Sequence, residues 1–109
     1  MLEKYHIQYE QEKRFKDCRD KKPLPFDFYL PTYNILIEFD GKQHYQKMKS
    51  FDTDESFKIR QNHDKMKTNY CYMHHIKLIR ISYLDMNNIE KILCKELHIN
   101  NENIIEDIV

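Results

Sequence analysis

The stretch FDFYLPTYNILIEFDG, residues 26–41, decides the fold. Its first five residues alternate aromatic or apolar side chains with others, and residues 34–39 are rich in β-branched and apolar side chains, so both runs predict strands. Residues 31–33 begin with a proline and predict a turn. Gly41, the only glycine of the chain, follows the second run, where the backbone leaves the sheet. The stretch therefore predicts a β-hairpin of residues 25–30 and 35–40.

Three acidic side chains converge at one end of this predicted hairpin. If residues 31–34 close the turn, Asp27 faces Glu38 directly across the ladder, with the two β-carbons ~5 Å apart. Asp40 shares a face with Glu38 because side chains alternate along a strand. Facing carboxylates repel each other, so the cluster needs a divalent cation, a cationic side chain or a shared proton to compensate. The leading interpretation is a divalent cation, and oxygen ligands suit Mg²⁺ or Mn²⁺.

The same acids admit a simpler interpretation. Asp27 would point to solvent, and Lys42 or an arginine would neutralise Glu38 and Asp40. A slip of one residue in strand register would also remove the facing pair, because it moves every side chain to the other face.

Polar residues beyond the hairpin could act beside such a site. His44 lies four residues past Asp40, and a histidine next to a metal site can transfer protons or orient water. Asp64 and Lys67 lie one helical turn apart and could reach a phosphate or contact His44. The alternatives are a loop histidine without a role and an ordinary surface pair of charges.

The whole chain, residues 1–109, predicts a single α+β domain with a mixed β-sheet flanked by helices. Residues 7–14 predict an edge strand, and the two prolines within residues 21–25 predict a break. Further along, we expect a loop at 42–52, a helix at 53–73, a buried strand at 76–83 and a second helix at 88–98.

The predicted helix of residues 53–73 has two unlike faces. One face carries Ile59, Met66, Tyr70 and Met73, and the opposite face carries Arg60, Asp64, Lys67 and Cys71. The polar face therefore reaches a site only if that site overhangs the helix.

Composition limits the class of protein. Charged residues make up 33% and hydrophobic residues 40%, which predicts a soluble globular chain. The formal net charge is zero, yet residues 41–84 hold nine basic and four acidic side chains, so either a local basic face or an ordinary solvated surface is consistent.

Apolar runs too short to span a membrane and the lack of a signal sequence predict an intracellular protein without a membrane partner. Three widely spaced cysteines predict free thiols. The abundance of Asn, Lys and Ile suggests the AT-rich genome of a phage, a large virus or a low-GC bacterium.

The strings FDFYLP at residues 26–31 and IEFDGKQH at residues 37–44 resemble the PD-(D/E)XK nuclease superfamily, and within it the very-short-patch-repair-like and homing-endonuclease-like branch. Residues 64–67 and 76–81 also resemble that branch, so the resemblance covers residues 5–93. It implies a restriction-endonuclease-like core with Mg²⁺, or Mn²⁺, held by Asp27, Glu38 and the Phe39 carbonyl. It further implies that His44 acts on the water or the leaving group, with Asp64 supporting it, in metal-assisted phosphodiester hydrolysis.

Two features depart from the family pattern. The position two residues after the glutamate, where the family has a lysine, holds Asp40, so Lys42 or Gln43 would substitute or His44 would make a lysine unnecessary. The N-terminal helix, which carries another glutamate in relatives, is missing or reduced to one turn, with Glu3 as its acid. This departure predicts either a truncated or weakly active protein, or a homodimer in which the partner subunit supplies the missing element.

The leading hypothesis is a metal-dependent DNA endonuclease. Supporting roles at its site fall to Asp40, Lys42, Gln43 and Lys67, and phosphate contacts to Lys47, Lys49 and Arg60. The alternative is a catalytically weak or inactive nuclease-fold module that binds nucleic acid or a protein partner. A third interpretation is a structural protein with fortuitous acids.

Overall fold

The computed structural model describes residues 2–41 and 53–99, which form one four-stranded sheet and its flanking helices. In chain order the elements are β1 (Glu10–Arg19), β2 (Pro23–Leu30), β3 (Ile35–Asp40), α1 (Asp54–Met73), β4 (Lys77–Ser82), a 3-10 helix (Tyr83–Asn88) and α2 (Ile89–Glu96). The strands lie in the order β1-β2-β3-β4, with antiparallel β1/β2 and β2/β3 pairs and a parallel β3/β4 pair. The expected α+β class with a mixed sheet is confirmed.

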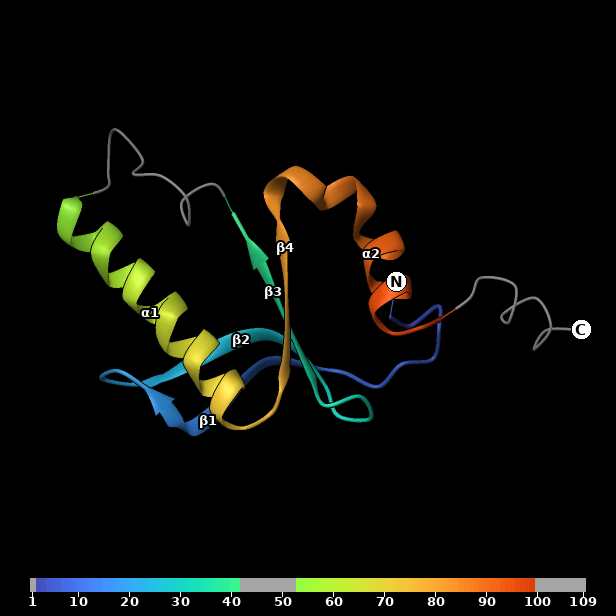
Figure 1. The fold of residues 1–109 in the computed structure, drawn as a ribbon, viewed down its shortest axis with the longest axis horizontal. Coiled ribbons are helices and arrows are strands. Elements are labelled where there is room, and N and C mark those ends of the chain that lie inside the picture. The colour runs from blue at the N-terminus through green and yellow to red at the C-terminus, as the bar shows by residue number, and fades with distance from the viewer. Residues whose placement is uncertain (1, 42–52, 100–109) are drawn as a thin grey trace, which may run out of the picture.

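The two helices cover opposite faces of the sheet, as Figure 1 shows. On the α2 side, the buried core is made by Leu2, Ile7, Leu30, Ile35, Ile37, Ile79, Ile81, Leu93 and Leu97. On the α1 side, it is made by Cys18, Leu24, Phe26, Leu36 and Cys71. The parallel β3/β4 pair is buried on both faces, which explains why residues 35–37 are uniformly apolar.

The predicted hairpin register is confirmed between β2 and β3. Phe28 pairs with Ile37 and Leu30 with Ile35. Residues 31–34 close the turn, and Asn34 adopts a φ of 54°, a left-handed conformation that asparagine tolerates better than most residues. Alternation and turn chemistry were sufficient here because both are local properties of the sequence.

The expected break at residues 21–25 is confirmed at residues 21 and 22 but wrong at residues 23–25, because β2 already begins at Pro23. Pro23 and Pro25 pair with β1, whereas the register of β2 with β3 starts only at Phe28. The first half of β2 is therefore not paired with β3 along its second edge. A proline, which lacks a backbone N–H, is tolerated there because no ladder hydrogen bond is needed. The β1 strand also starts later than expected, at Glu10, and runs to Arg19.

The helix α1 has nearly the expected bounds but the opposite orientation. The Thr53 side chain caps it by accepting a hydrogen bond from the Ser56 backbone N–H at 3.0 Å. Ile59, on the apolar face, is 45% exposed, whereas Lys67 and Cys71 are buried against the sheet. The polar face turns inward because β3 presents two buried carboxylates beneath it, so charge complementarity prevails over the apolar stripe.

The chain termini of the described region add two observations. Among residues 2–9, which precede β1, residues 2–6 form turns and none lies in a helix. The expected helix at 88–98 is shorter, Ile89–Glu96, and follows the 3-10 helix directly. In the described part of the chain, no helix combines the length and apolar character needed to cross a membrane.

Candidate functional site

Asp27 and Glu38 meet at the end of the β2/β3 ladder and bond to each other's strands. The backbone N–H of Asp27 donates to Oε1 of Glu38 at 2.9 Å. The backbone N–H of Phe39 donates to Oδ2 of Asp27 at 2.7 Å. Each carboxylate thus takes the place of a ladder carbonyl, which fixes both side chains where the backbone pairing stops.

The strand β2 is irregular at Asp27. Its even-numbered side chains change from the α1 core at Phe26 to the α2 core at Phe28. On the neighbouring strand, Glu12 lies between the Gln11–Phe28 and Lys13–Phe26 ladder pairs and has a φ of 50°. Such interruptions redirect side chains, and this one lies where the Asp27 carboxylate turns toward β3.

Glu38 is buried and forms an ion pair with α1. It is 3% exposed, and the Lys67 Nζ lies 3.0 Å from its Oε2. Burial raises the pKa of the Glu38 carboxyl, while the Lys67 ammonium and the Asp27 N–H act in the opposite direction. The interpretation of Lys67 as one half of a surface pair with Asp64 is therefore wrong, because Lys67 is only 9% exposed and contacts β3.

Asp40 belongs to a neighbouring ion pair. Its carboxylate, 4% exposed, accepts hydrogen bonds from Arg80 Nη1 of β4 at 3.3 and 3.4 Å. The Arg80 Nη2 donates to the Asp64 carbonyl at 3.0 Å and to the Thr68 hydroxyl at 2.9 Å. Arg80 therefore fastens β3 to the turn of α1 that carries Lys67. Glu38 and Asp40 thus each pair with their own cation, while Asp27 accepts from the Phe39 backbone N–H, so the three acids do not form a single carboxylate cluster.

Arg80 was missed by the sequence analysis, although a signal was present. Arg80 is a charged residue placed between two buried isoleucines of β4, Ile79 and Ile81. In the parallel ladder Arg80 pairs with Glu38. Asp40 lies two residues further along β3, on the same face, and pairs with Ser82. Recognising it needed the β3/β4 pairing, which joins residues about 40 positions apart.

The oxygen atoms at this site fit a magnesium ion in part. No group of three or more His, Cys, Asp or Glu side chains suited to a metal occurs within residues 2–41 and 53–99. However, Mg²⁺ is often held by one or two carboxylates together with water and substrate phosphates. Asp27 Oδ1 has no hydrogen bond to the described residues, and each Glu38 oxygen has one donor and a remaining lone pair.

Several predicted residues lie outside the described part of the chain: Lys42, Gln43, His44, Lys47 and Lys49. Arg60 lies on the inward side of α1, half-buried, with its guanidinium 5.6 Å from the centre of the Phe57 ring. Its phosphate contact stays a prediction. Asp64 is half-buried, and its Oδ1 lies 3.9 Å from Arg80 Nη1.

Comparison with known proteins gives one viral relative. No family model matches the chain, and no solved structure matches it. The chain is similar to "Uncharacterized protein 307L" of Invertebrate iridescent virus 6, with 31% identity over 61 residues. That match covers 55% of this chain and 31% of the viral protein, so the chain spans less than a third of its relative's length.

Proposed function

We propose that this chain is a metal-dependent DNA endonuclease that hydrolyses phosphodiester bonds. The observation that carries the proposal is the buried Lys67–Glu38 pair, which lies beside an Asp27 carboxylate whose Oδ1 accepts no hydrogen bond from residues 2–41 and 53–99. Two acids held at the end of a hairpin are suited to a divalent cation, and a lysine beside them is suited to a phosphate oxygen. We also propose that its core has the restriction-endonuclease-like fold and that the chain is of viral origin.

Asp27 and Glu38, with the Phe39 carbonyl, would hold Mg²⁺ or Mn²⁺. The bound ion supplies a Lewis acid for the phosphate and lowers the pKa of a bound water. His44 would transfer the proton, with support from Asp64, Lys42 and Gln43.

Lys67 supplies the positive charge that the family places two residues after the glutamate. What this role needs is an ammonium group close to the second acid in space, whatever its position in the sequence. Lys67 of α1 places its Nζ 3.0 Å from Glu38 Oε2. Lys67 would then contact a non-bridging phosphate oxygen when the substrate arrives. The Asp40 that occupies the usual lysine position has a different task, because it bonds Arg80 and so positions α1.

The second candidate is an inactive nuclease-fold module that binds nucleic acid or a protein. One observation favours it: both oxygens of Glu38 accept a hydrogen bond from a protein group, Asp27 N–H and Lys67 Nζ. The two candidates differ in metal linkage. An ion that binds the native state raises its unfolding temperature, so a midpoint that does not change with millimolar Mg²⁺ or Mn²⁺ favours the inactive module.

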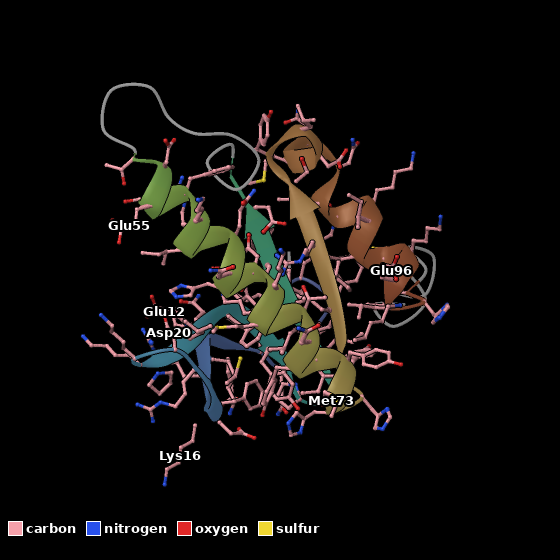
Figure 2. The ribbon with its side chains drawn as sticks, turned by 60° about the vertical axis from the view of Figure 1, so that its left-hand side comes forward. Glu12, Lys16, Asp20, Glu55, Met73 and Glu96 are labelled. Atoms are coloured by element: carbon pink, nitrogen blue, oxygen red, sulfur yellow. The ribbon has the colours of Figure 1, made fainter. Side chains whose placement is uncertain are left out.

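The endonuclease proposal is tested by plasmid cleavage with Mg²⁺ or Mn²⁺. We expect the wild-type chain to nick or linearise the plasmid and the Glu38→Gln variant to lose this activity. Glu55→Gln is the matched control, because Glu55 is an exposed acid in the first turn of α1 (Figure 2). Equal cleavage by wild type and Glu38→Gln would refute the assigned site, and no cleavage by any of the three would leave the inactive module ahead.

A further inference from the structure

The β1/β2 hairpin carries a group of cations without ion pairs. All five are exposed, and none forms an ion pair with another described residue: Arg14, Lys16, Arg19, Lys21 and Lys22. We call these five residues the hairpin cation group. Figure 2 shows blue nitrogen tips gathered around the outer end of the hairpin, with Lys16 pointing away from the body of the protein.

The two acids nearest these cations contact α1. Asp20 Oδ2 lies 3.0 Å from His63 Nε2. Asp17 accepts a hydrogen bond from the Tyr70 hydroxyl at 3.0 Å and lies 3.5 Å from His74. These two acids contact α1 and form no ion pair with the cations, and residues 14–22 hold five basic side chains against two acidic ones.

Five other cations of the described chain have a carboxylate partner. These pairs are Lys4–Glu90, Lys13–Glu10, Lys67–Glu38, Lys77–Glu96 and Arg80–Asp40. Among the described residues, four further lysines also form no ion pair, but they are spread along α1 and α2: Lys58, Lys65, Lys91 and Lys95. What distinguishes the hairpin is that five such cations lie within residues 14–22.

The hairpin cation group rests on a fixed scaffold. Arg14 donates to the Pro23 carbonyl, and Arg19 Nη2 donates to the Lys21 carbonyl at 3.1 Å, so both arginines stiffen the hairpin end. Arg14, Lys21 and Lys22 also line a hollow of about 450 Å³ between the hairpin and α1, together with His63 and Asp20. A preorganised cationic rim of this kind suits anionic oxygens.

We propose that the hairpin cation group binds the phosphate backbone of a DNA duplex. The proposal rests on the endonuclease function and identifies where its substrate is held. No large exposed hydrophobic side chain of the described residues lies on this hairpin, so it offers nothing to insert into a lipid surface. Asp27 lies on the same strand as Pro23, ~13 Å further along, so the cations would meet phosphates roughly four base pairs from the cleaved bond.

The test measures the salt dependence of binding to a DNA duplex of about 20 base pairs in EDTA, which prevents cleavage. Lys21 and Lys22 are the residues to change, because neither side chain makes a hydrogen bond or ion pair within the described chain. In Lys21→Ala/Lys22→Ala, the slope of log K against log salt should fall in magnitude by about 1.8, at about 0.9 per lost phosphate contact. Lys91→Ala/Lys95→Ala, which removes two exposed lysines from α2, is the matched control and should leave the slope nearly unchanged.

Three results would overturn the proposal. They are an unchanged slope in the hairpin variant, an equal fall in the α2 control, and loss of binding to phosphatidylserine vesicles with DNA binding intact. Because binding is measured without metal, each of these results leaves the endonuclease proposal standing. That proposal fails separately, if Glu38→Gln cleaves as well as wild type.

Discussion

Replacing Lys67 with methionine removes the ammonium that lies 3.0 Å from the Glu38 carboxylate and keeps most of the side-chain volume. Both partners are buried, with side chains 11% and 4% exposed. In the variant, Glu38 keeps the Asp27 N–H as a donor but loses its counter-charge. Its carboxylate must then stay charged in a poorly solvated position or take up a proton.

The expected loss of stability is large. Breaking a buried ion pair by removing one partner costs about 3–5 kcal/mol. A Coulomb estimate at 3.0 Å gives ~5 kcal/mol with an effective dielectric constant of ~20, which is of the same size. We therefore expect Lys67→Met to lower the free energy of unfolding by about 3–5 kcal/mol at about pH 8.

The loss should depend on pH in a defined direction. Burial already raises the pKa of Glu38, and Lys67 opposes that rise, so removing Lys67 raises the pKa further. A carboxyl whose folded pKa lies above its unfolded pKa contributes stability that is present at low pH and lost as the pH rises through the folded value. The difference between wild type and Lys67→Met should therefore shrink as the pH falls from about 8 toward about 5.

Urea denaturation at the two pH values measures both effects. Lys65→Met is the matched control, because Lys65 lies two residues away on α1 and is exposed. It should change the free energy of unfolding by less than about 0.5 kcal/mol. A loss below about 1 kcal/mol for Lys67→Met, or a loss that grows toward acidic pH, would refute the buried pair as described.

Two further predictions concern the neighbouring network and the core. Arg80→Gln should lower the free energy of unfolding by about 2 kcal/mol in urea denaturation, because it removes the hydrogen bonds to Asp40 and to the Asp64 carbonyl; a change below about 0.5 kcal/mol would contradict this. Burial raises the pKa of the Cys71 thiol to about 11, so iodoacetamide at about pH 8 should modify the half-buried Cys94 well before Cys71, as mass spectrometry of the peptides would show. Faster modification of Cys71 would contradict its burial.

Local features of the sequence were sufficient for the hairpin that carries Asp27 and Glu38. Alternation and the turn at residues 31–34 set its register, and the structure has that register from Phe28 to Leu30. The bounds of α1 were also predictable, since the cap at Thr53 is a local signal.

The orientation of α1 was not predictable from its own residues. Its apolar stripe, which includes Ile59, indicated that this face packs on the sheet. In the structure the opposite face, with Lys67, packs on the sheet, because β3 presents the buried carboxylates of Glu38 and Asp40 there. Which face packs on the sheet therefore depended on residues that are distant in sequence, and periodicity within one helix does not contain that information.

The hairpin cation group was missed for a related reason. Counted over residues 1–40, seven basic and eight acidic side chains nearly cancel. The structure separates them, because Asp17 and Asp20 bond to α1 while Lys21 and Lys22 remain exposed. Charge counted along the chain does not show which charges are already paired in space.

The central claim, that Asp27 and Glu38 hold a divalent cation, is tested most directly by titrating Mn²⁺ and following the free ion by electron paramagnetic resonance. We predict binding by the wild-type chain and affinity weaker by about tenfold or more in Asp27→Asn. The control Asp85→Asn, which changes an exposed acid of the 3-10 helix, should bind as wild type does. Equal affinity in wild type and Asp27→Asn, or no binding by wild type at millimolar Mn²⁺, would contradict the claim.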